Sequence, residues 1–210
     1  MAGILAPPEQ KVLLKVGWDT YERLLAEHVN NLGTRFTYDQ ELLEIMVVSV
    51  GHEAPNRTLA LLAEIVAEET GRDVLQSGSA TFKREDLLKG FEPDSSFYLD
   101  AHAELVRGKK ELDLRVDPPP DLVIEIDITS SSLPRLPIFA AVGVAEVWRY
   151  EGRRVVFFCL EDAGYVEVER SAVLPPITSR QATVFLDESE RLKQPAWLRR
   201  VRDWVRAQKA

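Results

Sequence analysis

Hydrophobic residues recur along the chain at two different spacings, which together predict a mixed α/β protein. Four stretches carry apolar positions three or four residues apart, as one face of a helix does. In the longest of them the apolar stripe is Leu59, Leu62, Ala63 and Val66, and Gly71 follows as a helix stop. The expected helices run over about 18–28, 52–70, 134–142 and 187–207.

Between these helices, short runs rich in β-branched and aromatic residues predict strands. The polar stretch 101–120 ends in three prolines, so we expect a connection that closes in a stiff turn. No repeat or linker interrupts the pattern, and we therefore expect a single domain over 1–210, with a core at about 41–160 and a helical tail at about 187–207. The expected strands lie near 34–38, 41–48, 73–76, 79–84, 95–100, 121–128, 145–150, 153–160 and 164–169.

The most informative departure from this pattern is a set of acidic residues within apolar strands. Asp94 stands at the head of one expected strand, in the run Glu92-Pro93-Asp94. In the next expected strand Asp121, Glu125 and Asp127 share one side, because successive side chains of a strand point to opposite faces. Acids in such a setting cost free energy unless a divalent cation or basic side chains offset their charge.

Composition and charge exclude several classes of protein. The 210 residues are 45% hydrophobic, which is enough for one α/β domain with a real core. The net charge of −8 argues against a protein that coats nucleic acid without specificity, since that task needs a broad basic surface. It does not argue against a nuclease, because a local basic groove can coexist with an acidic whole.

The expected location is the cytoplasm. No apolar run approaches the roughly 20 residues of a membrane span, and the first ten residues lack the basic and apolar regions of a signal peptide. The single cysteine, Cys159, cannot form an internal disulfide, and its apolar neighbours predict a buried strand. We expect no contact with a membrane.

Several segments resemble the Uma2 family, which is assigned to the restriction-endonuclease-like fold of the PD-(D/E)XK superfamily. The resemblance is strongest in 90–94 and 118–132, continues through 137–150, and extends upstream to 44–46 and 52–53. It implies a mixed central β-sheet flanked by helices in the order αβββαβ, with an extra N-terminal helix and strands and a C-terminal helix. The implied activity is that of an endonuclease.

Residue by residue, the resemblance assigns the two acids of the motif. Asp94 matches the acid of the "PD" half, and Glu125, 31 residues later, matches the "(D/E)" position. The lysine expected two residues after that glutamate is replaced by Asp127. In many members the basic residue comes instead from the next helix, where this chain has Arg135, with Phe139 four residues on. An arginine can hold a phosphate, but it stays protonated and cannot accept a proton.

The resemblance also implies a metal and a nucleic-acid partner. Phosphodiester hydrolysis needs an activated water and neutralised phosphoryl charge, and Mg²⁺ or Mn²⁺ can provide both. The implied ligands are the carboxylates of Asp94 and Glu125 and the backbone carbonyl of Ile126. His52 and Glu53 open the long helix and could reach the metal through water. DNA is the expected substrate, and a homodimer the expected assembly, with the tail helix and the 153–169 hairpin as candidate contacts.

Each candidate residue also has a purely structural interpretation. Asp94 lies in a sequence typical of turns, and Asp121 after three prolines reads as a turn or cap residue. Glu125 could form a structural salt bridge with an arginine, and His52 could be an ordinary residue at a helix start.

Two other segments have a similar choice of interpretations. The run 129–132 could bind phosphate at a helix start or simply cap that helix. The tail arginines could contact DNA, but such a run is more often the solvated face of a packed helix; these are Arg199, Arg200, Arg202 and Arg206.

Two functions therefore remain open on the sequence. The first is a metal-dependent endonuclease, and the second is a binding or assembly module that keeps the nuclease fold without catalysis. The constellation of Asp94, Glu125 and Asp127 makes the first the leading hypothesis, while the acid at the lysine position and the negative net charge motivate the second. An unrelated small-molecule hydrolase has no motif to support it, since neither a Gly-x-Ser-x-Gly elbow nor a zinc-type His/Cys spacing occurs.

Overall fold

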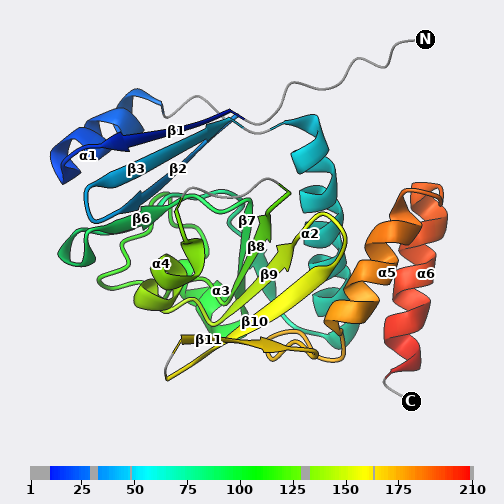
Figure 1. The fold of residues 1–210 in the computed structure, drawn as a ribbon. Coiled ribbons are helices and arrows are strands. Elements are labelled where there is room, and N and C mark those ends of the chain that lie inside the picture. The colour runs from blue at the N-terminus through cyan, green and yellow to red at the C-terminus, as the bar shows by residue number, and fades with distance from the viewer. Residues whose placement is uncertain (1–9, 29–32, 48, 129–132, 163, 209–210) are drawn as a thin grey trace, which may run out of the picture.

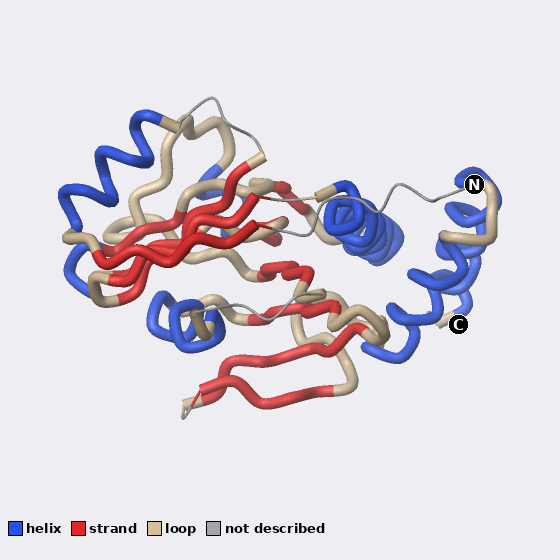
Figure 2. Tube along the Cα trace, turned by 45° about the horizontal axis from the view of Figure 1, so that its top comes forward, coloured by secondary structure: helices blue, strands red, loops and turns tan. Residues whose placement is uncertain are grey.

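The strands collect in two sheets, which Figure 1 and the turned view of Figure 2 show one above the other. A computed structural model describes residues 10–28, 33–47, 49–128, 133–162 and 164–208. The first sheet has five antiparallel strands in the order β1-β3-β2-β6-β5. These strands are β1 (Gln10–Lys15), β2 (Thr34–Asp39), β3 (Leu42–Val47), β5 (Phe82–Arg84) and β6 (Lys89–Phe91).

The second sheet has six strands in the order β11-β10-β9-β8-β7-β4. Its central pair, β8 and β9, is parallel, and the other pairs are antiparallel. A parallel pair needs a crossover, which α4 (Arg135–Val142) provides. The strands are β4 (Val74–Gln76), β7 (Ser95–Leu99), β8 (Leu122–Ile126), β9 (Glu146–Tyr150), β10 (Val155–Glu161) and β11 (Gly164–Val168).

Helices cover both faces of the second sheet. On one face, α2 (Val50–Thr70) and α5 (Ser179–Ser189) contact the strands, and α6 (Gln194–Ala207) packs on these two helices (Figure 1). The other face carries α3 (Asp100–Val106) and α4, together with phenylalanines from β5 and β6. The N-terminal helix α1 (Trp18–Glu27) covers the first sheet through a buried, mostly aromatic cluster, and a short 3-10 helix (Glu85–Leu87) joins β5 to β6.

Side chains along β8 alternate between its two faces, and this alternation sets the direction of the Glu125 side chain. Leu122, Ile124 and Ile126 are buried in the core formed with α2, α5 and α6. Val123 is buried in the core on the α4 side, and Glu125 shares its parity along the strand. The side chain of Glu125 is therefore directed toward α4 and the boundary between the two sheets.

The predicted fold class is confirmed. The order αβββαβ is found in α2, β4, β7, β8, α4 and β9, with further strands and helices at both ends. The long helix stops at Gly71, whose φ of +75° suits a residue without a side chain. Cys159 lies in β10 as predicted, but it is half-buried rather than buried.

The sequence predictions were wrong for several elements. The stretch expected as a plain connection contains α3, which has only seven residues and too few apolar positions to show a helical period. The helix expected over about 187–207 corresponds to α6, which begins only at Gln194 with Pro195 in its first turn, and α5 (Ser179–Ser189) was not predicted. The strands β1 and β6 were missed, since the first is a mostly exposed edge and the second has only three residues.

The tail arginines belong to the solvated face of a packed helix. Arg202 pairs with Glu68 at 3.0 Å and Arg206 with Glu69 at 2.7 Å, which ties α6 to α2. The apolar side of α6 is buried in the core and is not available for the two-fold contact expected of it; its residues there are Trp197, Val201 and Val205.

None of the helices in the part of the chain that the structure describes has the length and apolar character needed to span a bilayer.

We expect Gly90→Ala to destabilise the first sheet. A Cβ atom at Gly90 would lie 2.8 Å from Cζ of Tyr21, a fully buried ring that stacks on Tyr38 with centroids 4.7 Å apart. Because that ring cannot move away freely, the loss should be about 1–3 kcal/mol in chemical denaturation. The matched control is Gly51→Ala, where the nearest atom to the new Cβ is 3.8 Å away. If the loss persists unchanged in a Tyr21→Ala background, the steric explanation is wrong.

Candidate active site

Asp94 lies immediately before β7, beside the acid-bearing end of β8. Ser95 pairs with Ile124 across the two strands, so the register continued by one residue brings Asp94 next to Glu125. The backbone N–H of Ile126 donates to Oδ2 of Asp94 at 2.8 Å, and the side chain is only 1% exposed. Asp94 is thus a buried acid fixed to the strand that carries the second acid.

The first turns of α2 hold Asp94 from the other side. His52 Nε2 lies 3.3 Å from Oδ2 of Asp94, and Nδ2 of Asn56 donates to the backbone carbonyl of Asp94 at 3.1 Å. Ser95 Oγ in turn donates to Oδ1 of Asn56 at 2.9 Å. His52 and Asn56 are four residues apart and share one face of the helix. Sequence reasoning missed Asn56, although its spacing from His52 was the available signal.

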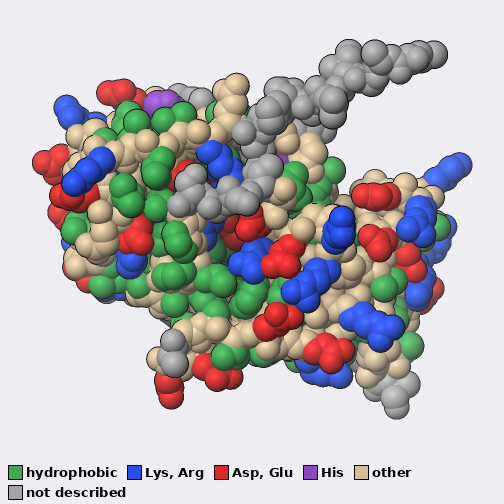
Figure 3. Space-filling view, viewed as in Figure 1, with side chains coloured by type: hydrophobic (Ala, Val, Ile, Leu, Met, Phe, Trp, Pro, Cys, Tyr) green, Lys and Arg blue, Asp and Glu red, His purple; other side chains and the backbone are tan. Residues whose placement is uncertain are grey.

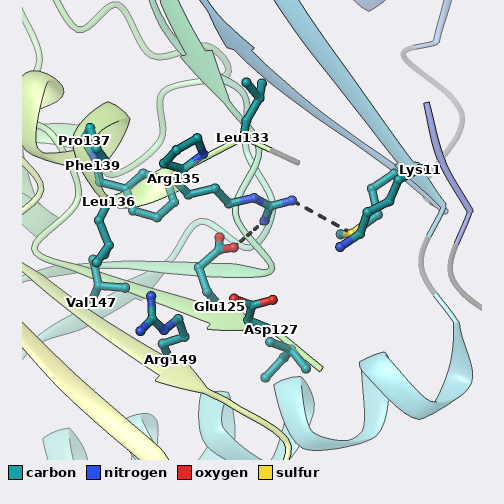
Figure 4. Close-up of a pocket in the computed structure, with 13 residues that line it drawn as sticks. Lys11, Glu125, Asp127, Leu133, Arg135, Leu136, Pro137, Phe139, Val147 and Arg149 are labelled. Atoms are coloured by element: carbon teal, nitrogen blue, oxygen red, sulfur yellow. Dashed lines mark hydrogen bonds and ion pairs between the residues drawn. The ribbon is translucent and has the colours of Figure 1, made fainter. Parts of the chain in front are cut away.

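Glu125 faces the start of α4, where Arg135 binds it (Figure 4). Nη1 of Arg135 donates to Oε2 of Glu125, and Nη2 lies 3.5 Å from Oε1 of Glu44 on β3. Nη2 also approaches the sulfur of Met46 at 3.9 Å. A single guanidinium thus joins an acid of the first sheet to an acid of the second. In the sequence, Glu44 stood out only as part of a segment that resembles the family. Nothing in its six-residue strand indicated that its side chain would be buried.

Burial dominates the electrostatics of the two motif acids. It raises the pKa of Asp94 to about 6, against the opposing effect of the Arg135 charge and the hydrogen bond from Ile126. It raises the pKa of Glu125 to about 7, where Arg135 again opposes the shift and the charge of Asp94 adds to it. The site therefore favours either a proton or an additional cation near these carboxylates.

Each of the two acids has one oxygen that makes no hydrogen bond. Oδ1 of Asp94 and Oε1 of Glu125 are both buried and lack a hydrogen-bond partner. Buried polar atoms are nearly always satisfied, so these two oxygens are suited to coordinate a cation. Hard divalent cations prefer carboxylate oxygens, and Mg²⁺ needs only one or two of them besides water and phosphate.

This arrangement fits a two-carboxylate metal site rather than a complete protein cage. Among the residues that the structure describes, no group of three or more His, Cys, Asp or Glu side chains converges in a way that could hold a metal ion. The remaining ligands would have to come from water, from substrate and from the backbone. The backbone carbonyl of Ile126 as a ligand stays a prediction.

A cavity of about 600 Å³ lies beside Glu125, at the boundary between the sheets (Figure 4). Its polar lining contains three basic and two acidic side chains, and its apolar lining comes mostly from α4 and the residues before it. Asp94 does not line the cavity. The lining residues are Lys11, Met46, Glu125, Ile126, Asp127, Leu133, Pro134, Arg135, Leu136, Pro137, Phe139, Val147 and Arg149.

The other predicted site residues fall in different places. Asp127 is half-buried and lines the cavity. Glu53 is one-third exposed and pairs with Arg57 at 2.9 Å, but its charge still raises the pKa of Asp94. Asp121 lies at the other end of β8, where it accepts from the backbone N–H of Leu99 at 2.7 Å and lies 2.8 Å from Nδ1 of His102, so its contacts are structural. The run 129–132, a candidate phosphate site, lies outside the described residues.

Comparison with known families finds a match over most of the chain. The family model Uma2, described as "Putative restriction endonuclease", matches residues 18–187. The matched range includes both motif acids, Arg135 and the start of α2, and it leaves out β1. No curated protein matches the chain.

We expect metal-free Asp94→Asn to be more stable than the wild type at pH 8. The folded protein holds a proton on Asp94 more tightly than the unfolded chain does. The stability from that proton is complete below about pH 4 and is lost as the pH rises through about 6. Asparagine stays neutral and still accepts from Ile126, so thermal unfolding in EDTA should show a gain on the order of 2 kcal/mol at pH 8, shrinking toward pH 5. A variant less stable than the wild type at pH 8 would contradict this account.

Proposed function

The chain belongs to the Uma2 family, and on that premise we propose that it is a metal-dependent endonuclease that hydrolyses phosphodiester bonds of DNA. The observation that carries the proposal is the pair of buried carboxylates, Asp94 and Glu125. They come from adjacent strands, and each has one oxygen without a hydrogen bond. The side chain of Glu125 borders a cavity large enough for part of a nucleic-acid strand. An ion pair with a purely structural role needs no such cavity beside it.

In this proposal Asp94 and Glu125 hold Mg²⁺ or Mn²⁺, with the carbonyl of Ile126 as a third ligand. When bound, such an ion lowers the pKa of a water and neutralises charge on the phosphoryl oxygens. His52 and Asn56 act as positioning residues, because they fix the carboxylate and the backbone of Asp94. Glu53 stands near enough to influence Asp94 by its charge.

Arg135 has a different task from the lysine of the motif. Its guanidinium stays protonated, so it offsets the charge of Glu125 and Glu44 and offers donors to a phosphate. It cannot take a proton from the attacking water. Asp127 occupies the motif position of the lysine, and its carboxylate lines the cavity. We propose that Asp127 accepts the proton from the attacking water.

The distribution of charge supports local rather than broad contact with nucleic acid. On the face drawn in Figure 3, basic and acidic side chains are interspersed, as the net charge of −8 suggests. The basic residues that matter for a bound phosphate are those of the cavity lining, namely Lys11, Arg135 and Arg149.

A second function is supported by a specific observation. Arg135 already pairs with Glu125, and an acid occupies the lysine position. A binding or assembly module could keep this ion pair as a structural link between the sheets and use the cavity without catalysis.

Cleavage assays with Mg²⁺ or Mn²⁺ on plasmid and single-stranded DNA test the enzyme. We expect Asp94→Ala and Glu125→Ala to lower the rate by about 100-fold or more, because each removes a proposed metal ligand. The matched control is Asp121→Ala, because Asp121 is an acid at the opposite end of β8 and does not line the cavity. Calorimetry should show Mn²⁺ binding to the wild type and its loss in the two variants.

Activity that persists unchanged in both variants would refute the site assignment. If the wild type binds no Mn²⁺ even at millimolar concentration, the module without catalysis becomes the better proposal.

We also expect a homodimer, since a pair of sites can cut both strands of a duplex. With the apolar side of α6 buried, the candidate contact is the β10–β11 hairpin at the edge of the second sheet, where Val166 is 37% exposed. Sedimentation at tens of micromolar should show the dimer, and Val166→Asp should weaken it. A purely monomeric wild type at that concentration would remove this expectation.

A further inference from the structure

One basic side chain of the cavity comes from outside the part of the chain that matches the family. Lys11 lies on β1, an edge strand of the first sheet, and the family match begins at residue 18. It nevertheless lines the same cavity as Glu125 and Asp127. The cavity wall is therefore completed by a strand that the family model does not include.

The register of β1 directs Lys11 toward the site. Lys11 pairs with Met46 across the antiparallel strands, and directly opposed residues place their side chains on the same face. Met46 in turn approaches Arg135 with its sulfur 3.9 Å from Nη2. Figure 4 shows the Lys11 side chain extending into the cavity from the wall opposite α4, across from Asp127.

The two arginines of the cavity are held in place by acids. Arg135 pairs with Glu125 and Glu44. Arg149 donates to Glu151 at 2.6 Å, and its guanidinium carbon lies 4.6 Å from the centre of the Phe158 ring. Lysine adds a different kind of donor to this lining, because its ammonium is a compact charge on a flexible stem.

We propose that Lys11 binds a phosphate of the nucleic-acid strand in this cavity, donating from its ammonium group to a non-bridging oxygen. The inference rests on the proposed function. Glu125 and Asp127 repel a phosphate, and a positive charge from the opposite wall offsets that repulsion. Lys11 thus supplies from a different strand the amine that the chain lacks at position 127.

The test measures binding of a fluorescent single-stranded oligonucleotide in EDTA over a series of salt concentrations. The proteins are the wild type, Lys11→Ala, Lys11→Arg and Lys15→Ala. Lys15 is the matched control, because it lies on the same strand with the same parity, is 78% exposed and does not line the cavity.

We expect Lys11→Ala to weaken binding several-fold and to reduce the slope of log affinity against log salt by about 0.7, as the loss of one phosphate contact on a single strand requires. Lys11→Arg should keep the slope, since it keeps the charge, and Lys15→Ala should change neither quantity. Thermal unfolding of each variant checks that β1 remains paired. In the cleavage assay, Lys11→Ala should be slower and Lys11→Arg should recover most of the rate.

Two results would overturn the inference, and they differ in meaning. If Lys11→Ala and Lys15→Ala behave alike while the wild type binds and cleaves, the inference is wrong and the proposed function stands. If the wild type neither binds the oligonucleotide nor cleaves any substrate, the proposed function fails and the inference fails with it.

Discussion

The site depends on one guanidinium placed between buried acids of two sheets. Arg135 meets Glu125 on β8 and Glu44 on β3, and both carboxylates are almost inaccessible to water. Burying acids is costly unless charge of the opposite sign lies close by, and removing one partner of such a group leaves the others uncompensated. The contact also fixes how the two sheets approach each other, and with it the cavity beside Glu125. Charge balance and architecture are therefore set by the same side chain.

The charge of Arg135 does not fully offset the cost of burying the acids, and this is what allows the site to bind a cation or a proton. One oxygen of Asp94 and one of Glu125 remain without hydrogen bonds, and burial still raises the pKa of both carboxyl groups. Because burial outweighs the charges that oppose it, the site retains an affinity for a further cation or for protons. Glu125 and Asp127 border the cavity, whereas Asp94 does not line it and is held from α2 through Asn56.

Much of this could be predicted from the sequence, for reasons that also explain what could not. The acids of β8 stood out because they interrupt an apolar strand, and the long helix was marked by its stripe and by Gly71. Asn56 and Glu44 were missed because their roles arise from contacts between segments 38 and 91 residues apart, which no local pattern records. Lys11 was missed because β1 is an exposed edge strand without clear alternation.

The link between Arg135 and Glu125 also bears on how such a protein changes during evolution. A substitution of either residue leaves the buried charge of the other without this counter-charge. Selection for folding alone is therefore enough to retain both. Persistence of this pair among descendants would thus say little about whether catalysis was kept. Asp94 is more revealing, because an asparagine there would keep the hydrogen bond from Ile126 and remove the buried charge. Lineages that no longer bind the ligand should therefore change to a neutral residue at this position first.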